Sequence, residues 1–147
     1  MHTWDARCGV CHADANGNPE NVRLVHPEDY DGDADVSESL RSEIDGMATA
    51  LLGAMQSAAG PTGLCYDVAV YPYFFNDPNA DGVCSTEEAT SVNAFTLWTA
   101  ELMRAAHNYQ LSRKDPGAYA HNFDYIGQLL FDSTENLLQS VGSMTRP

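Results

Sequence analysis

One short run constrains this chain more than any other feature, the segment Cys8-Gly9-Val10-Cys11-His12. The spacing C-x-x-C-H is typical of proteins that attach haem covalently. Two thiols at this spacing can add to the two vinyl groups on one edge of a porphyrin, while the adjoining imidazole reaches the iron from one face. We therefore expect Cys8 and Cys11 to hold a c-type haem and His12 to ligate its iron.

Two other interpretations of the motif are a thioredoxin-like redox pair and half of a zinc site. The sequence has no second C-x-x-C and no H-x-x-x-H to complete a zinc site, and no strand pattern precedes Cys8. Haem c is attached outside the cytoplasm, so we expect an exported protein, periplasmic or extracellular. No basic stretch followed by an apolar one opens the chain, and we expect any signal peptide to have been removed.

Charge and length limit the partners and the architecture. Seven Lys and Arg oppose 21 Asp and Glu, which gives a formal net charge of -14. This surface repels nucleic acid and favours redox partners that present basic patches. No apolar run approaches the roughly 20 residues of a membrane-spanning helix, so we expect no transmembrane span. The length of 147 residues suits one cytochrome c-like domain over residues 1–147.

The other two cysteines, Cys65 and Cys84, lie in a loop-rich part of the chain. Thiols tend to be oxidised in the compartment that the haem motif implies. We therefore expect a structural disulfide between them, with free reactive thiols as the less favoured alternative.

The segment 77–88 matches the calcium loop of EF-hand proteins position by position. Oxygen donors stand at positions 1, 3 and 5, Gly82 stands at position 6, and a glutamate stands at position 12. The expected calcium ligands are Asp77, Asn79, Asp81, the Val83 carbonyl, Ser85 and Glu88.

Another acidic loop, 29–40, has the same alternating carboxylates but departs from the pattern. Ala34 stands where glycine is expected, and Leu40 stands in place of the last glutamate. Glu38 or Glu43 could supply the missing ligand from the helix that follows. The candidate ligands of this second calcium are Asp29, Asp31, Asp33, Asp35 and Glu38. The alternative for both loops is a solvated acidic turn at a helix N-terminus.

Apolar residues recur at helical spacing in three segments, and the region after the haem motif has no such period. We expect helices over 38–58, 86–111 and 122–141, the second beginning at a capping box, Ser85-Thr86-Glu87-Glu88. Residues 66–75, which include Pro72, should form an extended loop or edge strand. The predicted fold is mainly α, with about three long helices around one c-type haem and irregular loops that wrap the haem and bind calcium.

An electron-transfer haem needs a second axial ligand. The other histidines are His2, His26, His107 and His121, and there are five methionines. Spacing alone leaves the choice open, although His26 follows the haem motif closely and His121 stands at an expected helix end.

Several stretches together resemble the C-terminal region of exported multihaem c-type cytochromes of metal-respiring bacteria. This resemblance implies a helical electron-transfer module, makes His121 the first choice for the distal ligand and His26 the second, and is compatible with calcium. The chain differs in having a single C-x-x-C-H. The stretches are the haem motif and segments 26–33, 71–75, 98–99, 108–110, 114–122 and 128–133.

Three functions are compatible with these features. The first is an electron carrier, not an enzyme, with one c-type haem and structural calcium. The second is a haem-bearing structural subunit of a larger electron-conducting complex, homo-oligomer or filament. The third is a peroxidase-like haem enzyme, which needs an open position on the iron.

Overall fold

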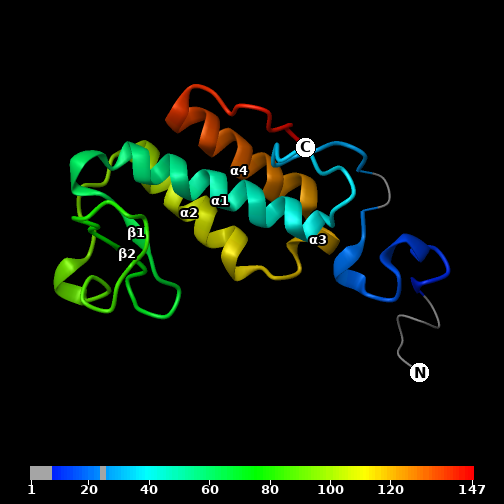
Figure 1. The fold of residues 1–147 in the computed structure, drawn as a ribbon, viewed down its shortest axis with the longest axis horizontal. Coiled ribbons are helices and arrows are strands. Elements are labelled where there is room, and N and C mark those ends of the chain that lie inside the picture. The colour runs from blue at the N-terminus through cyan, green and yellow to red at the C-terminus, as the bar shows by residue number, and fades with distance from the viewer. Residues whose placement is uncertain (1–7, 24–25) are drawn as a thin grey trace.

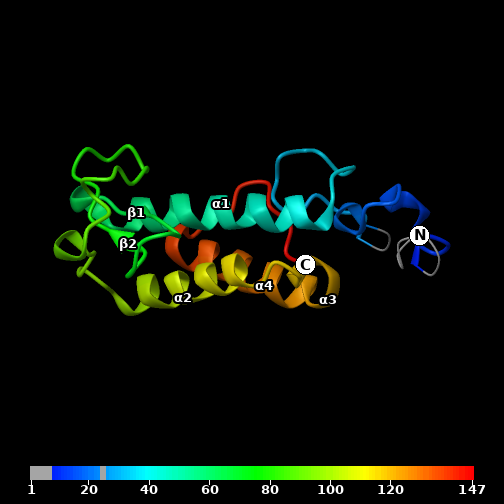
Figure 2. The same ribbon diagram turned by 90° about the horizontal axis from the view of Figure 1, so that it is seen from below.

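Three helices carry the apolar periodicities seen in the sequence. A computed structural model of the chain describes residues 8–23 and 26–147, so His2 lies outside the described residues. The helices are α1 (Leu40–Ala58), α2 (Ala100–Lys114) and α4 (Phe123–Leu138). Each contacts the other two, and Figures 1 and 2 show them as one bundle. The predicted mainly α fold with three long helices is confirmed.

The bundle is held by apolar side chains that the three helices direct toward one another. Burying this surface is the main favourable contribution to folding. The helices therefore pack around a core of their own side chains, and the segment with Cys8 and His12 lies beside one end of the bundle (Figures 1 and 2). The core includes Ile44, Met47, Leu51 and Met55 of α1, Leu102, Ala105 and Tyr109 of α2, and Ile126 and Leu130 of α4.

The first and last long helices begin and end close to the expected positions. α1 begins after Ser39, whose Oγ accepts a hydrogen bond from the Ser42 N–H at 3.1 Å. It ends before the turn Gly60–Thr62, where Pro61 cannot continue a helix. α4 ends at Leu138, and the next residue, Gln139, takes a left-handed conformation with φ of 61°. A short helix, α3 (Ala118–His121), precedes α4.

The predicted start of the second helix near residue 86 is wrong. Ser85 and Glu88 do exchange hydrogen bonds as in a capping box, with N to O distances of 2.9 and 3.2 Å. The following backbone nevertheless pairs with another segment, because the Phe95 N–H donates to the Phe74 carbonyl at 3.0 Å. α2 begins only at Ala100, where the Thr99 side chain accepts from the Leu102 N–H at 3.1 Å.

The aromatic segment forms two very short strands rather than a longer one. β1 (Cys65–Tyr66) and β2 (Phe74–Phe75) are antiparallel, and a cis peptide bond precedes Pro72 between them. The strands lie at one end of the bundle, and the Cys8 segment lies at the other (Figures 1 and 2). Within the described residues, no helix has both the length and the apolarity to cross a bilayer.

Candidate functional site

The motif of two cysteines and one histidine folds into a tight turn. The backbone N–H groups of Cys11 and His12 both donate to the Cys8 carbonyl at 3.0 Å. Cys8 is half-buried and Cys11 is exposed, and neither forms a disulfide within the described part of the chain. The turn therefore leaves both thiols available for covalent attachment and keeps the imidazole next to them.

A cavity of about 560 Å³ lies next to this turn, within the range of about 300 to 1,000 Å³ for cofactor and ligand pockets. His12, His26 and His121 all line it. Its other walls come from the segment after the motif and from the region where α3 meets α4. The fold thus gathers into one cavity the expected proximal ligand and both candidates for the distal ligand. Of these three residues, His12 and His121 are 109 positions apart in the sequence.

His26 is held firmly on one side of its ring. Its Nδ1 lies 3.2 Å from the Tyr30 hydroxyl and 3.7 Å from Asp124 Oδ1. The ring also packs edge-on against Phe123, with 4.8 Å between the ring centroids. The side chain is 21% exposed. Contacts at Nδ1 leave Nε2 as the nitrogen that can ligate a metal, which is a common arrangement for histidine ligands.

His121 has a different environment, although it lines the same cavity. Its Nε2 lies 3.3 Å from Asp115 Oδ1, and 61% of its side chain is exposed. It is the last residue of α3, a helix of four residues. At His121 the Asp115 carboxylate therefore lies against Nε2, the nitrogen that the contacts of His26 leave available for a metal.

Arg23 joins the cavity to the body of the molecule. Its guanidinium lines the cavity and donates to Glu43 Oε1 at 2.5 Å and to the Glu38 carbonyl at 2.9 Å. It also donates to the Glu28 carbonyl. Glu43 is fully buried, and the N–H groups of Tyr30 and Asp31 donate to its Oε2 at 2.8 and 3.0 Å. Buried charges require such partners.

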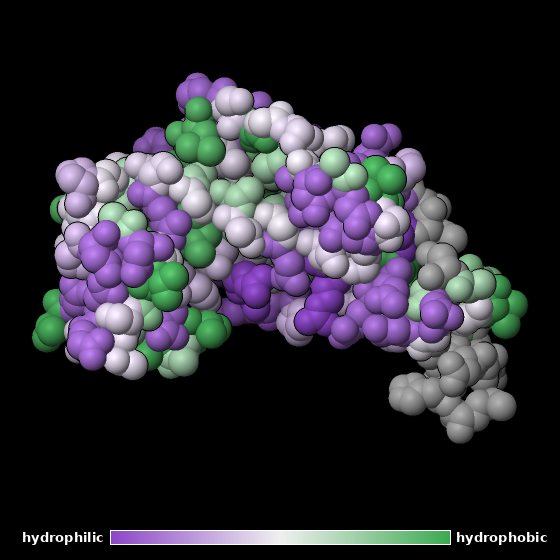
Figure 3. Space-filling model, in the orientation of Figure 1, coloured by the Kyte–Doolittle hydropathy of each residue, from purple (hydrophilic) through white to green (hydrophobic). Residues whose placement is uncertain are grey.

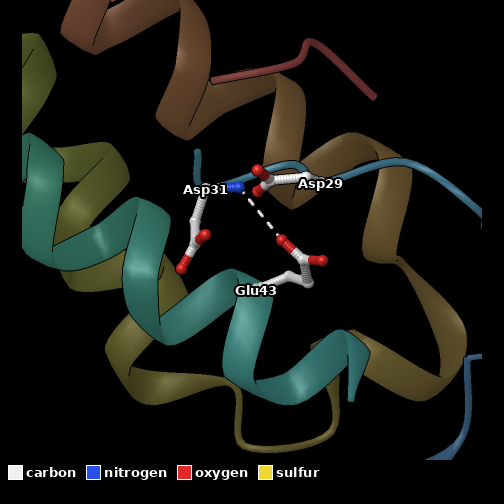
Figure 4. Close-up of side chains that lie close together, drawn as sticks. All are labelled: Asp29, Asp31 and Glu43. Atoms are coloured by element: carbon white, nitrogen blue, oxygen red, sulfur yellow. Dashed lines mark hydrogen bonds between the residues drawn. The ribbon is translucent and has the colours of Figure 1, made fainter. Parts of the chain in front are cut away.

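Glu43 also belongs to an acidic cluster with Asp29 and Asp31 of the acidic loop 29–40 (Figure 4). A second group consists of Asp31, Asp33 and Glu38, and in each group the carboxylate oxygens lie within 4.8 Å of one another. In residues 8–23 and 26–147 these are the groups of three acidic, His or Cys side chains that could hold a metal ion.

Crowding changes the proton affinity of the carboxyls in this loop. Burial, together with the neighbouring charges of Asp31 and Glu43, raises the pKa of Glu38 to about 7. Burial also raises the pKa of Asp31. Asp35 differs, because hydrogen bonds from Ser37 lower the pKa of its exposed carboxyl, and it belongs to neither group of described side chains.

The second acidic loop, 77–88, has the internal hydrogen bonds of a tight Asx-type turn. Asp77 is 1% exposed, and its Oδ2 accepts from the Gly82 N–H at 2.7 Å. Its Oδ1 is buried and has no hydrogen-bond partner among the described residues. Gly82 has a φ of +78°, which favours glycine. Glu88 Oε2 accepts from the Ser85 N–H, and Asp77, Asp81 and Glu88 are not among the carboxylate groups that converge in the described structure.

The expected disulfide between Cys65 and Cys84 is present. It links β1 to the second acidic loop across 19 positions of sequence. The bridge fixes this loop against the end of the bundle that lies away from the cavity (Figure 1).

Sequence reasoning missed Arg23 and Asp124, which line the cavity, and Tyr30, whose hydroxyl contacts His26. Tyr30 follows the predicted distal candidate by four positions, but it lies in a loop without a period that would indicate its partner. Asp124 comes from α4, so only the tertiary fold brings it to His26.

This chain is homologous to part of c-type cytochromes that are named as polyhaem proteins. It is 31% identical to the C-type polyheme cytochrome OmcB of Geobacter sulfurreducens over 142 residues, which cover 91% of this chain and 16% of OmcB. It is 37% identical to OmcC of the same species over 100 residues, 63% of this chain and 13% of OmcC. The chain thus spans about one sixth of the OmcB length. No family model and no solved structure matches it.

Proposed function

We propose that this chain is an electron-transfer segment that holds a c-type haem through thioether bonds to Cys8 and Cys11. The observation that carries the proposal is the cavity beside the motif, because it is lined by His12 and by two further histidines. The homology to polyhaem cytochromes supports it independently. A haem supplies a single redox centre whose iron exchanges one electron, and its potential depends on axial ligation and burial.

The residues of the chain have separate tasks in this proposal. The two thiols fix the porphyrin edge, and His12 provides the proximal imidazole. Arg23 holds the cavity wall in place through its ion pair with the buried Glu43 of α1. The apolar and aromatic side chains of the wall, such as Phe123 and Tyr119, limit access of water. A less hydrated site favours the less charged state of a redox group.

Between the two candidates for the distal ligand, we favour His26. Tyr30 and Asp124 hold its Nδ1, so its Nε2 is oriented and available. At His121, Asp115 lies against Nε2, and the side chain is mostly exposed. The expectation based on resemblance put His121 first, and this proposal reverses that order.

The proposed setting is an exported electron-transfer system. The disulfide and the relatives both support export to the periplasm or cell surface. Because the chain corresponds to about one sixth of OmcB, we propose that its haem is one link in a relay formed with further haems. Partners with basic patches would complement the net charge of -14.

We also propose that calcium stabilises the acidic loops. For loop 77–88, support comes from the buried Asp77 Oδ1, which lacks a hydrogen-bond partner in the described part of the chain and would be satisfied by a cation. For loop 29–40, support comes from the convergence of Asp31, Asp33 and Glu38. Asp35 lies outside this group of described carboxylates, and its Oδ1 accepts hydrogen bonds from the N–H and hydroxyl of Ser37, so we do not include it among the preferred ligands.

The haem proposal is tested by spectroscopy on the protein produced in an export host that matures haem c. We expect covalent haem and a low-spin bis-histidine signal by optical and electron paramagnetic resonance spectra. His26→Ala should convert the signal to high spin, whereas His121→Ala should leave it low spin. Absence of covalent haem from the wild type would overturn the function, and the opposite result for the two variants would overturn only the choice of ligand.

Calcium is tested separately by calorimetric titration of the chelator-treated protein. Asp77→Asn should weaken one binding event and Glu38→Gln the other, each by about tenfold, because each removes one charged ligand. Asp132→Asn, which removes an exposed carboxylate of α4, is the matched control. Wild-type protein that takes up no calcium would exclude a structural role for the ion.

A further inference from the structure

A second hollow in the described structure lies away from the histidine cavity. It is a groove of about 800 Å³ between the end of the β1–β2 connection and α2. Its floor and walls include Tyr73, Phe74 and Trp98. Phe74 and Trp98 meet edge-to-face, with 5.5 Å between their ring centroids. The groove is therefore apolar and aromatic, like most small-molecule sites.

The charge of the groove is opposite to that of the molecule. The whole chain has three times as many acidic as basic residues, 21 against seven. Among the described residues that line the groove, none is Asp or Glu, whereas Arg104 and Lys114 both line it. His107 of α2 lines it as well. A site that excludes carboxylates on such an acidic protein favours an anion.

The two cations keep donors available for a ligand. The Lys114 Nζ lies over the Tyr73 ring, 4.1 Å from its centroid, so the ammonium is held at the groove wall by a ring and not by a carboxylate. Arg104 Nη2 lies 3.4 Å from Glu101 Oε1 in an exposed contact. Exposed pairs of this kind are weak, and a guanidinium has five N–H donors.

Exposed apolar side chains extend the same region. Met103 of the groove is 52% exposed, and Leu97 next to Trp98 is 57% exposed. Figure 3 shows apolar residues at the surface of the end of the molecule that carries β1 and β2. These exposed apolar side chains enlarge the apolar surface that a ligand in the groove can contact.

From these observations we propose that the groove between β2 and α2 binds a planar aromatic anion. The ring system lies against Tyr73, Phe74 and Trp98, and its carboxylate or sulfonate faces Lys114, whose Nζ lies over the Tyr73 ring. This site goes beyond the proposed electron-transfer function and does not depend on it, because the groove shares no lining residue with the histidine cavity in the described structure.

The test compares two probes that differ only in charge, pyrene-1-carboxylate and pyrene-1-carboxamide, by equilibrium dialysis against the haem-loaded protein. Fluorescence of the free probe is read in the chamber without protein. We expect the carboxylate to bind about tenfold more tightly than the amide, because Lys114 lies at the aromatic wall and Arg104 adds positive charge to the same groove. The preference should fall as salt is added.

Matched variants locate the site. The pair Arg104→Gln with Lys114→Gln should abolish the preference for the carboxylate, whereas Arg41→Gln with Arg146→Gln, which removes as much charge elsewhere, should keep it. Met103→Glu, at an exposed position, should weaken the carboxylate by about tenfold and spare the amide. Leu138→Glu, at the exposed end of α4, is its control.

Three results would overturn the proposal. The first is equal binding of the two probes, and the second is equal loss in the two cation pairs. The third is self-association, seen as a mass in sedimentation that rises with concentration and falls in Met103→Glu, because a second copy would then occupy the groove. Protein with both Cys8→Ala and Cys11→Ala, which cannot attach haem, is dialysed in parallel and should show the same preference for the carboxylate. Failure of the haem proposal and failure of this one are therefore distinguishable.

Discussion

At the scale of single residues, Tyr30 connects the histidine cavity to the interior. Its hydroxyl lies 3.2 Å from His26 Nδ1, and its N–H donates to the buried Glu43 at 2.8 Å. The ring packs against Phe123 with 5.0 Å between centroids. Burial raises the pKa of Tyr30, so the phenol stays neutral and acts as a hydrogen-bond partner.

Tyr30→Phe removes that partner and keeps the ring. If His26 ligates the iron through Nε2, its Nδ1–H loses an acceptor, the imidazole becomes a weaker electron donor, and the reduction potential should rise while the haem stays low spin. Stability should fall by about 1 kcal/mol. Potentiometric titration and urea unfolding measure the two effects. Tyr71→Phe, a 78% exposed tyrosine at the other end, should change neither.

Glu38 should make stability depend on pH. Its pKa in the folded protein is about 7, above the usual 4.5, because of burial and nearby carboxylates. Between these two values the folded state binds more protons than the unfolded state, so stability falls as pH rises from about 4.5 to 7. Urea midpoints in the presence of chelator should fall less over this range in Glu38→Gln than in wild type. If the urea midpoint changes equally with pH in the two proteins, Glu38 does not cause the pH dependence of stability.

At the scale of elements, the start of α2 was decided by strand pairing and not by local signals. Both Ser85 and Thr99 accept a backbone hydrogen bond from a residue three positions ahead. Only Thr99 leads into a helix. A capping sequence stabilises a helix only where the residues that follow it can form one.

The two positions therefore make a matched pair. Thr99→Ala should lower the free energy of unfolding by about 1 kcal/mol, because it removes the N-cap of a core helix. With chelator present, Ser85→Ala should change it by less than about 0.5 kcal/mol, since no helix begins there. Urea unfolding measures both. An equal cost at the two positions would contradict the assignment of the helix start.

The disulfide should stabilise the strand end of the bundle. It closes a loop across 19 positions, from Cys65 to Cys84. Replacing both residues by alanine should cost about 3 kcal/mol, because the unfolded chain regains the freedom of that loop. Chemical denaturation measures the loss. The haem spectrum should be unchanged, because the cavity lies at the opposite end of the bundle (Figure 1).

At the scale of the whole molecule, one buried carboxylate joins parts that are distant in the sequence. Glu43 of α1 binds Arg23 and the backbone of Tyr30 and Asp31. The same loop receives the C-terminal segment, since the Thr145 N–H donates to the Tyr30 carbonyl at 3.2 Å. The cavity wall, α1 and the chain end therefore depend on one network.

Glu43→Gln should destabilise the protein by about 3 kcal/mol, because Arg23 loses its buried counter-charge. Amide hydrogen exchange should quicken at Tyr30 and Thr145 together. Glu101→Gln, which breaks an exposed pair with Arg104, should cost less than about 0.5 kcal/mol. A similarly small loss of stability in both variants would show that the Glu43 network does not hold these parts of the molecule together.

The sequence alone determined those features that are local or periodic. Apolar spacing predicted α1 and α4 within a few residues, since a buried helix face repeats along the chain. Pro61 and Pro116 marked breaks, and the pairing of Cys65 with Cys84 followed from a count of the cysteines. The C-x-x-C-H spacing indicated a haem, because five consecutive residues hold both thiols and the imidazole that its attachment needs.

Only the tertiary structure decided contacts between segments without a shared period. It placed His26, His121 and Asp124 at one cavity, and it put Asp115 against the nitrogen of His121 that a metal would need. It moved the start of α2 by pairing Phe95 with β2. It also lined a groove of an acidic protein with cations. Such arrangements depend on distances through space, which no local pattern in the sequence encodes.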